Sequence, residues 1–372
     1  MKIVHVVSCG GWSSDAYWAA RVCRELDRAG QEATLVCRRG TEERVISRAR
    51  GEGVARIQTL GLRAGLRPGE DLRDLGLLRA WLPRIDVVHV HRGKEHWLAA
   101  LANRRLPRRR PLVRTRHIVQ AIRPHALNRW LYSRATDLVV TVSEAIRRQC
   151  VAAGLVPEER AVSLPGGADG ERFRPGSDAA ALRRELDLPA GPPIVGLLAG
   201  FRVMKGHAVV VEAAAALAAA GREFHVLFAG QGPLLAAIRE RVTRAGLGDR
   251  ASFLGFVDDP ARVVGALDVA LYPPLESDGM SRSLLEYLAA GRAVIASRVG
   301  VAAEVLRDGE SALLVPGGDA PELARALDRL LGDPALRRRL GERAAALAHE
   351  RLTGDRLAAR LIGQYRSLAA PS

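Results

Sequence analysis

Short runs of β-branched and apolar residues alternate with Ala-, Leu- and Arg-rich helical patterns along the whole 372-residue chain. Buried strands separated by helices are typical of parallel sheets with helices on both faces. The pattern therefore predicts an α/β fold with two doubly wound, Rossmann-like domains of five or six strands, each with its ligand crevice at the carboxyl ends of its strands. The expected strands are Ile3–Val7, Ala33–Cys37, Val87–Val90, Leu112–Thr115 and Leu138–Val142 in the first half, and Ile194–Ala199, His225–Ala229, Ser252–Leu254, Val269–Tyr272, Ala293–Ala296 and Ala312–Val315 in the second.

Proline and glycine mark the expected boundary between the two domains. They cluster over residues 165–176 and again over 189–193, where the strand patterns stop. We place the hinge near residues 165–175 and expect one domain over residues 1–170 and a second over 171–352. After Ala320 the pattern is helical, with helices starting at Pro321 and Pro334. A last amphipathic helix, within residues 353–372, is expected to pack back on the first domain.

The basic excess of the chain lies in its first half. Residues 1–175 carry 32 Lys and Arg against 18 Asp and Glu, whereas residues 176–372 carry 24 against 23. The net charge of +15 favours an acidic partner, either nucleic acid or an anionic membrane surface. The Arg clusters at 104–105 and 108–110, and the stretch 123–134 with Trp130 and Tyr132, are the expected membrane contact. The alternative is that this Arg-rich chain simply carries solvated cations on its helices.

The cysteines and the apolar segments indicate a cytoplasmic protein. Four cysteines, at positions 9, 23, 37 and 150, lie in apolar stretches without the spacing of a zinc site, which fits reduced structural thiols. The first apolar run is too short for a signal-peptide core, and no window reaches the roughly 18 apolar residues of a membrane span. We expect a cytoplasmic location, with peripheral binding to the inner face of the cytoplasmic membrane.

Two strand-to-helix loops have the geometry of a phosphate cradle, because free backbone amides and the helix dipole attract an anion there. Ser8-Cys9-Gly10-Gly11 follows the first strand, and Gly200 to Gly206 follows strand 194–199. The second loop carries Arg202 and Lys205, and Lys205 is one of only three lysines among 56 basic residues. Neither loop reads GxGxxG or GxxxxGK[ST], which disfavours dinucleotide enzymes and P-loop NTPases. The alternatives are a tight turn in the first loop and two solvated cations in the second.

Residues 275–286 follow strand 269–272 and enter an apolar helix. We expect Asp278 in the loop and Glu286 on the first helical turn, with the amides of Gly279, Met280 and Ser281 exposed between them. Carboxylates accept hydrogen bonds from vicinal hydroxyls, and bare amides bind sugar or phosphate oxygens, so the segment suits a sugar nucleotide. The alternative is a capping box, in which Ser283 and Glu286 only close the start of the helix.

Histidines end two strands of the first half. His117 follows strand 112–115 and is expected to face the crevice, either as a catalytic group or as a satisfied structural one. His89 and His91 end another strand, with His96 nearby, but no carboxylate or cysteine completes a metal set. The chain also lacks an Asp-x-Asp pair that would hold a divalent cation on a diphosphate. We therefore expect no metal site.

Taken in order, these segments resemble the retaining glycosyltransferases of family 4, which have the GT-B fold. The match covers nearly the whole chain, and its specificity comes from the order and spacing of motifs that are individually weak. The two carboxylates at 278 and 286 are separated by seven residues, as in the family. The further markers are Gly10-Gly11, Thr141 to Glu144, Pro165 to Asp169 with Phe173 to Pro175, Lys205 to His207, Gly230 to Pro233, Phe253 to Val257, and Ala289 to Gly291.

The resemblance implies two Rossmann-like domains that face a central cleft, with the nucleotide sugar bound by the second. Arg202 and Lys205 would hold the donor diphosphate, Val257 would contact the base through its main chain, and Glu286 would bind the ribose. No resident cofactor or metal is implied, because a UDP- or GDP-type nucleotide sugar is the co-substrate.

The same resemblance assigns the transferred sugar to residues of both halves. Asp278 and the amides of Gly279, Met280 and Ser281 would hold the sugar. His117 and the Gly10-Gly11 loop would reach it from the first domain when the cleft closes.

Three positions depart from the family pattern. Asp278 stands where the family usually has Glu, with Glu276 two residues earlier as a possible substitute. Gly200 stands where an arginine is usual, and Arg202 is its plausible replacement. Gly166-Gly167 replaces Asn-Gly in the linker motif. These departures affect the identity of the donor sugar and the grip on the diphosphate more than the reaction class.

The predicted function is transfer of a sugar from a nucleotide sugar to a hydroxyl of an acidic or lipid-linked glycan, in synthesis of lipopolysaccharide or another envelope polysaccharide. The alternative is an inactive GT-B relative that binds nucleic acid or a membrane through its basic face. Nucleic acid is disfavoured because the half with the donor motifs is almost neutral. A sugar-phosphate enzyme of the phosphorylase kind is disfavoured because no lysine follows Lys205 to bear a cofactor.

Overall fold

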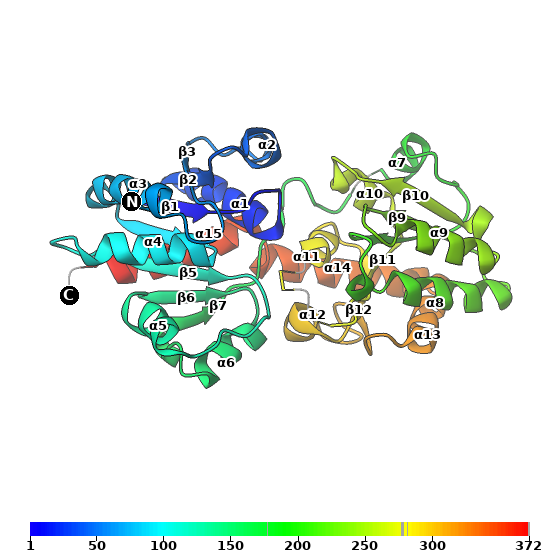
Figure 1. The fold of residues 1–372 in the computed structure, drawn as a ribbon. Coiled ribbons are helices and arrows are strands. Elements are labelled where there is room, and N and C mark those ends of the chain that lie inside the picture. Colours follow the sequence, from blue (N-terminus) through cyan, green and yellow to red (C-terminus); the bar gives the residue numbers. More distant parts are fainter. Residues whose placement is uncertain (177, 277–278, 281, 371–372) are drawn as a thin grey trace. The chain divides into compact units, whose positions relative to one another are not determined.

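The chain forms two compact units, Met1–Gly167 with Gly354–Ser372 and Ala168–Thr353. The computed structural model describes residues 1–176, 178–276, 279–280 and 282–370. Each unit contains one parallel sheet with helices on both of its faces (Figure 1). The α/β fold class with two Rossmann-like sheets is thereby confirmed.

The first unit has a seven-stranded sheet in the order β3-β2-β1-β4-β5-β6-β7. Sequential strands are added on one side of β1 and then on the other, so the topological switch point lies between β1 and β4. The strands are β1 (Lys2–Val7), β2 (Glu32–Arg38), β3 (Ile57–Leu60), β4 (Val87–Val90), β5 (Leu112–Arg116), β6 (Leu138–Thr141) and β7 (Ala161–Ser163). The helices are α1 (Ser14–Arg28), α2 (Ser47–Gly51), α3 (Pro68–Trp81), α4 (Gly93–Arg104), α5 (Ala126–Arg129), α6 (Glu144–Ala152) and α15 (Gly354–Ala369).

The two faces of the first sheet differ in composition. One face buries apolar side chains such as Val4, Val6, Val88 and Val90 in a hydrophobic core. The alternate residues of the same strands face α1 and the C-terminal helix α15, which pack against each other. Several of these alternate residues are buried polar side chains, and they matter for the site below.

The second unit has a six-stranded sheet in the order β10-β9-β8-β11-β12-β13. Both of its faces are apolar, because alternate residues of the central strands enter two separate hydrophobic cores. The strands are β8 (Ile194–Leu198), β9 (His225–Ala229), β10 (Ala251–Gly255), β11 (Val269–Tyr272), β12 (Ala293–Ser297) and β13 (Leu313–Val315). The helices are α7 (Ala179–Glu185), α8 (His207–Ala219), α9 (Leu235–Arg244), α10 (Pro260–Ala266), α11 (Arg282–Ala289), α12 (Gly300–Val305), α13 (Ala320–Gly332) and α14 (Pro334–Arg351).

Local sequence explains where the last helices begin. Asp319 and Asp333 cap α13 and α14, each accepting a hydrogen bond from a backbone amide three residues on, and a proline stands in the first turn of both helices. An Asp cap followed by Pro is a strong helix start, since Pro has no N–H to satisfy there. The helix starts predicted at Pro321 and Pro334 therefore agree with the structure to within one residue.

Candidate functional site

The loop between β8 and α8 places two cations before a helix. Arg202 is exposed, and Lys205 is partly buried on a single helical turn that ends at Gly206. Gly206 has a left-handed φ of 73°, and a Cβ there would come within 2.0 Å of the Pro273 carbonyl oxygen. Only glycine fits this position, so the loop must lie directly against the end of β11.

The segment that follows β11 leads into α11, which carries Glu286. Glu286 is 3% exposed, and its Oε1 accepts a hydrogen bond from Arg282 Nε at 2.7 Å. Gly279 and Met280 are both buried just before the helix. Asp278 and Ser281 lie outside the described residues, whereas Glu276 is exposed. The capping-box alternative is wrong, because α11 begins at Arg282 and Ser283 is therefore inside the helix.

These two loops meet at the switch point of the second sheet, where β8 and β11 are neighbours. The Leu275 amide donates to the Met204 carbonyl at 2.9 Å, which joins the two loops directly. Tyr287 of α11 also contacts β8: its hydroxyl accepts a hydrogen bond at 2.7 Å from the amide of Leu198, the last residue of that strand. Arg202, Lys205 and Glu286 therefore follow neighbouring strands at the carboxyl edge of one sheet, although 80 residues lie between Lys205 and Glu286 in the sequence.

The next two strands end beside this edge. Gly230 has a φ of 144°, and a Cβ there would lie 2.1 Å from the Ala199 carbonyl oxygen, so only glycine allows the loops after β8 and β9 to touch. The Gly230 amide donates to the Gly255 carbonyl at 2.6 Å at the end of β10. Val257 follows that strand, is partly buried, and packs against the hydrophobic core of the unit. Its main chain thus lies at the same edge as the two loops.

In the first unit, the loop with Gly10 and Gly11 joins β1 to α1. The Ser8 amide of this loop donates to Glu95 Oε1 at 3.2 Å. On the first turn of α1, the buried Asp15 accepts from Arg92 Nη2 at 3.1 Å. Hydrogen bonds from Arg92 and Ser13 and the positive charge of Arg92 outweigh burial, so the pKa of Asp15 is lowered to about 2. A fixed negative charge therefore lies beside this loop at neutral pH.

His117 follows β5 at the same edge of the first sheet and is 8% exposed. The Trp18 ring of α1 lies 5.4 Å from the His117 ring, measured between centroids. Burial lowers the pKa of His117 to about 3, against the opposing effect of the Asp15 charge. The side chain is therefore neutral at pH 7, and its Nδ1 has no hydrogen-bond partner among the described residues.

His117 is the end of a row of buried polar side chains that share hydrogen bonds through the interior of the first unit. His91 Nδ1 lies 3.0 Å from His117 Nε2, and His91 Nε2 lies 3.1 Å from His5 Nδ1. Tyr365 of α15 joins the row, with its hydroxyl 3.4 Å from His5 Nε2 and 2.6 Å from His89 Nδ1. His89 Nε2 lies 2.5 Å from Thr115 Oγ1. We call this set the histidine chain; its members are His117, His91, His5, Tyr365, His89 and Thr115.

The sequence suggests His89 and His91 as a pair and His117 on its own, but not the chain that joins them. A signal was present: His89 and His91 are two residues apart in an extended segment and so share a face. His5 pairs directly with His89 across β1 and β4, which requires the register of the sheet. Among the described residues, no group of three or more His, Cys, Asp or Glu side chains is arranged to hold a metal ion.

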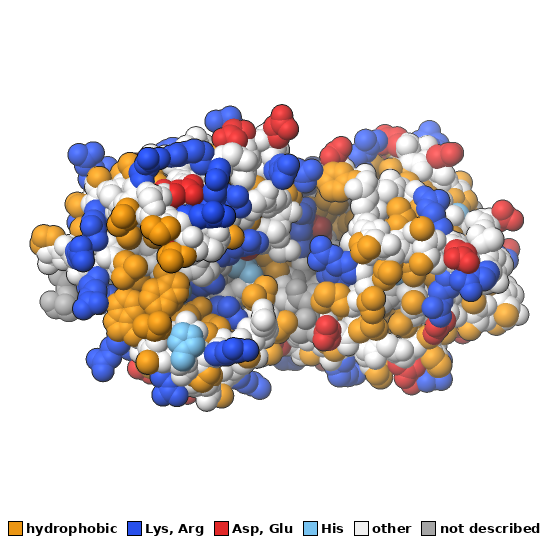
Figure 2. All heavy atoms as spheres, in the orientation of Figure 1, with side chains coloured by type: hydrophobic (Ala, Val, Ile, Leu, Met, Phe, Trp, Pro, Cys, Tyr) orange, Lys and Arg blue, Asp and Glu red, His pale blue; other side chains and the backbone are white. Residues whose placement is uncertain are grey.

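The surface of the first unit combines cations with apolar side chains. Figure 2 shows hydrophobic side chains gathered on one face of this unit, with Lys and Arg side chains around them. Trp97 and Trp130 stack with centroids 5.8 Å apart, and the guanidinium of Arg104 lies over the Trp130 ring. Leu127, nearby in the sequence, is 63% exposed. Tyr132, by contrast, is 5% exposed, so its expected place in a membrane contact is wrong. No described helix is long and apolar enough to cross a membrane.

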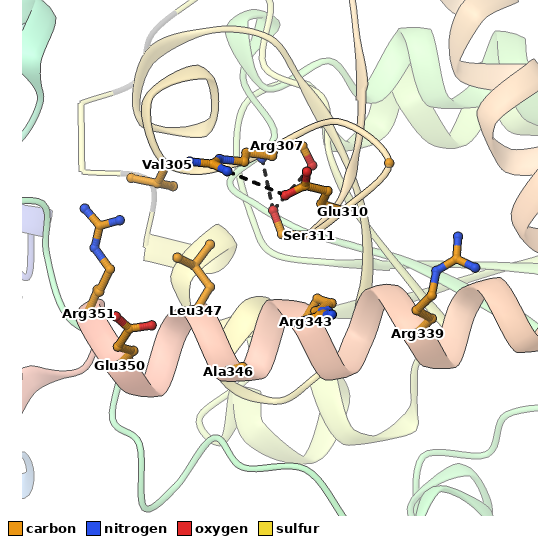
Figure 3. A pocket seen from close by; sticks show the side chains of 11 residues that line it. Val305, Arg307, Glu310, Ser311, Arg339, Arg343, Ala346, Leu347, Glu350 and Arg351 are labelled. Atoms are coloured by element: carbon orange, nitrogen blue, oxygen red, sulfur yellow. Dashed lines mark hydrogen bonds and ion pairs between the residues drawn. The ribbon is translucent and has the colours of Figure 1, made fainter.

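A pocket of about 680 Å³ lies in the second unit, away from the predicted site. Figure 3 shows arginines of α14 on one side of it and the loop after α12 on the other. Arg307 and Glu310 in that loop form an exposed ion pair. None of the predicted site residues lines this pocket.

Comparisons with known proteins match most of the chain. The family model described as Glycosyl transferases group 1 matches residues 178–347, and the one described as Glycosyltransferase Family 4 matches residues 16–172. A D-inositol 3-phosphate glycosyltransferase of Acidothermus cellulolyticus is 31% identical over 77% of this chain and 68% of its own length. One of the same description from Nocardia farcinica is 33% identical over 71% of this chain and 62% of its own.

A third relative is the lipopolysaccharide core biosynthesis glycosyltransferase LpsE of Rhizobium meliloti, 30% identical over 60% of this chain and 61% of its own length. The chain thus spans between 55% and 62% of the first curated relatives it matches.

Solved structures share the fold over the whole chain. A glycosyltransferase from Rickettsia africae has a TM-score of 0.86 at 20% identity, covering 100% of this chain and 99% of its own. Anabaena Alr3699/HepE, solved in complex with UDP and glucose, has a TM-score of 0.82 at 19% identity, covering 99% and 100%.

Proposed function

Because this chain belongs to the group 1 glycosyltransferases of family 4, we propose that it moves a sugar from a nucleotide-sugar donor to an acceptor hydroxyl with retention of anomeric configuration. The acceptor we propose is an acidic or lipid-linked glycan of the cell envelope. The catalytic groups are drawn from the carboxyl edges of the two sheets.

The observation that carries this proposal is the convergence of Arg202, Lys205 and Glu286 at the switch point of the second sheet. Ligands of open α/β sheets bind at such points. A diphosphate placed there meets two cations and the N-terminal end of α8, all of which favour negative charge. We assign Arg202 and Lys205 to the diphosphate.

Glu286 is suited to the ribose of the donor. Its carboxylate is buried and accepts a hydrogen bond from Arg282. We assign its remaining acceptor capacity to the vicinal diol of the ribose. Val257 is assigned to the base through its main-chain groups. Asp278 and the amides of Gly279, Met280 and Ser281 are assigned to the transferred sugar, with Glu276 as the substitute for Asp278.

The edge of the first sheet is assigned to the transferred sugar and the acceptor. Backbone amides of the Gly10-Gly11 loop are hydrogen-bond donors without charge. His117 adds a neutral side chain whose Nδ1 is unused among the described residues. The negative charge of Asp15 beside this loop disfavours a phosphate there, so we assign these neutral donors to hydroxyl oxygens.

The proposed reaction is a single exchange at the anomeric carbon. The bond from that carbon to the diphosphate oxygen breaks, and a bond to the acceptor oxygen forms on the same face. The proton of the acceptor hydroxyl passes to an oxygen of the leaving diphosphate. The two cations and the helix dipole stabilise the charge that develops on the leaving group, which is the main catalytic contribution of such a site.

The acceptor side rests on the basic surface of the first unit and on one relative. An anionic membrane attracts each nearby basic residue by roughly 1 kcal/mol. The relative LpsE is described as acting in lipopolysaccharide core biosynthesis. We therefore propose peripheral binding to the inner face of the cytoplasmic membrane, where a lipid-linked glycan would be presented.

A donor panel tests the proposed function. The full chain is incubated with UDP-, GDP-, ADP- and CMP-sugars and a membrane glycolipid extract, and nucleoside diphosphate release is measured. We expect one donor class to be turned over, and a Lys205→Ala, Glu286→Ala double variant to lose that turnover. If no donor is bound or turned over above the double variant, the transferase proposal fails and an inactive binding protein takes its place.

Metal dependence is tested in the same assay. The sequence has no Asp-x-Asp pair, so we propose that the reaction needs no divalent cation. EDTA should leave turnover within about twofold. A large loss with EDTA that magnesium restores would contradict this part of the proposal.

A further inference from the structure

The histidine chain is more than a set of packed rings, because its hydrogen bonds form one unbranched path. All six side chains are at most 8% exposed. The path begins at Thr115, passes through Tyr365 of α15, and ends at His117, whose Nδ1 has no partner among the described residues. Each link joins a specific atom pair, so the hydrogens along the path can be counted.

Every histidine in the path is neutral. Burial lowers the pKa of His5 to about 3 and places those of His89 and His91 well below the ordinary value. Burial also raises the pKa of Tyr365, so its hydroxyl keeps its hydrogen. A neutral imidazole has one N–H donor and one acceptor nitrogen. A donor at one link therefore forces the other nitrogen of the same ring to accept at the next link.

Two arrangements of hydrogens satisfy this rule while Tyr365 both accepts and donates. A third, in which the Tyr365 hydroxyl accepts from both His5 and His89, leaves its buried O–H without an acceptor and His117 Nδ1 without a hydrogen. In the first, Thr115 donates to His89, and each later group passes the donation on until His117 Nε2 accepts and His117 Nδ1 carries the last hydrogen. In the second, every donation is reversed. His117 Nδ1 then carries no hydrogen, and the Thr115 O–H has no acceptor.

The Thr115 hydroxyl decides between the two arrangements. Thr115 is fully buried, and among the described residues His89 is the only hydrogen-bond partner of its side chain. The reversed arrangement leaves the Thr115 O–H without an acceptor and His117 Nδ1 without a donor, whereas the first leaves only the His117 Nδ1–H unpaired until a ligand oxygen accepts from it.

We propose that the histidine chain fixes His117 as the Nδ1–H tautomer, so that His117 presents a hydrogen-bond donor to an oxygen acceptor of the ligand. His91, His5, Tyr365 and His89 are positioning residues in this account. Resting on the proposed function, the ligand atom is a hydroxyl or ring oxygen of the sugar or glycan. A ligand lacking that oxygen leaves a buried N–H unpaired and is selected against.

Nitrogen-15 spectra of histidine-labelled full-length protein at pH 7 test the tautomer without any substrate. The His117 signals are assigned by their loss in His117→Gln. We expect Nδ1 to bear the proton and Nε2 to be the acceptor. A proton on Nε2, or a doubly protonated ring, overturns the proposal. If His117 is the Nδ1–H tautomer but no sugar is transferred, the tautomer assignment stands and the proposed function fails.

Tyr365→Phe removes the link between the two halves of the chain. We expect His117 in this variant to become a mixture of both tautomers and kcat/KM to fall about tenfold, with nucleoside diphosphate affinity unchanged. Tyr132→Phe is the matched control, because Tyr132 is also buried in the first unit but lies outside the chain. An unaltered His117 spectrum in a folded Tyr365→Phe protein contradicts the positioning role. If that variant does not fold, the wild-type spectrum still decides the tautomer.

Discussion

The carboxyl edges of the two sheets differ in that a row of buried neutral histidines leads to the first and not to the second. At the switch point of the second sheet, charged side chains gather, with Arg202 exposed, Lys205 partly buried and Glu286 paired with Arg282. At the edge of the first sheet, a row of buried neutral histidines ends at His117, close to the ion pair of Asp15 with Arg92. Both edges occupy the same place in the same topology, so the difference comes from the side chains rather than from the fold.

The difference matches the two halves of a nucleotide sugar. A diphosphate is highly charged and is best held by cations and a helix dipole. A sugar carries only hydroxyls and is distinguished by hydrogen bonds whose direction is fixed in advance. Substitutions can therefore test the role of charge at one edge independently of the direction of hydrogen bonds at the other.

The largest expected effect is at Lys205. Lys205→Ala removes one charge from the proposed diphosphate site and should lower kcat/KM by about 100- to 1,000-fold in a steady-state assay. Arg244→Ala, an exposed cation on α9 paired with Glu240, is the control and should leave kcat/KM unchanged. Lys205→Arg keeps the charge but not its compact shape, and should recover only part of the loss. A Lys205→Ala enzyme within threefold of wild type would remove Lys205 from the site.

Glu286→Gln should have the next largest effect. The substitution keeps the shape of the side chain but removes a charge-assisted hydrogen bond to the ribose, which corresponds to about 10- to 100-fold in donor KM. Glu212→Gln makes the same change at an exposed position on α8 and should do nothing. A loss of thermal stability with unchanged donor KM would show that Glu286 serves only its ion pair with Arg282.

The sequence predicts most of the fold because buried strands are recognisable as continuous apolar runs. It misses β3 and β7, and both are edge strands of the first sheet. β3 carries Gln58 and Thr59 in its middle, and β7 is only three residues long. An edge strand is partly exposed and short, so it lacks the continuous apolar run by which central strands are recognised.

The two candidate sites also differ in how far apart their residues lie in the sequence. Arg202 and Lys205 lie in the loop that follows their strand, and Glu286 lies on the helix that follows the neighbouring one, where local motifs predict them. The histidine chain draws on β1, β4, β5 and α15, and its links depend on the pairing of His5 with His89 and on how α15 packs. Tyr365 lies 248 residues after His117 in the sequence, and no local pattern connects the two.

The pH dependence of folding stability tests whether His5 of the histidine chain is buried in its neutral form. His5 has a pKa of about 3 in the folded chain against an ordinary value of 6.5. Below pH 6.5 the unfolded chain therefore binds a proton that the folded chain does not, and stability falls as pH decreases. One such histidine contributes a slope of up to about 1.4 kcal/mol per pH unit.

His5→Gln should remove that share of the slope, measured by urea unfolding between pH 6.5 and pH 5. His125→Gln, at an exposed histidine of the same unit, should leave the slope as in wild type. Equal slopes in wild type and His5→Gln would mean that His5 is not desolvated.

The smallest expected effect concerns the basic surface of the first unit. Arg105→Ala should weaken binding to anionic liposomes about fivefold at low salt, from a loss of roughly 1 kcal/mol. Arg338→Ala, an exposed arginine of the second unit, is the control. The effect should disappear at high salt, because screening weakens surface charges. Equal binding to anionic and neutral liposomes would contradict the membrane contact.

Calorimetric titration of the full chain with UDP and with GDP tests the division between a charged and a neutral edge most directly. We expect one of the two nucleotides to bind, Lys205→Ala with Glu286→Gln to abolish that binding, and His117→Gln to leave it unchanged. Binding that depends on His117, or that survives the loss of both Lys205 and Glu286, would contradict the assignment of the diphosphate to the second unit.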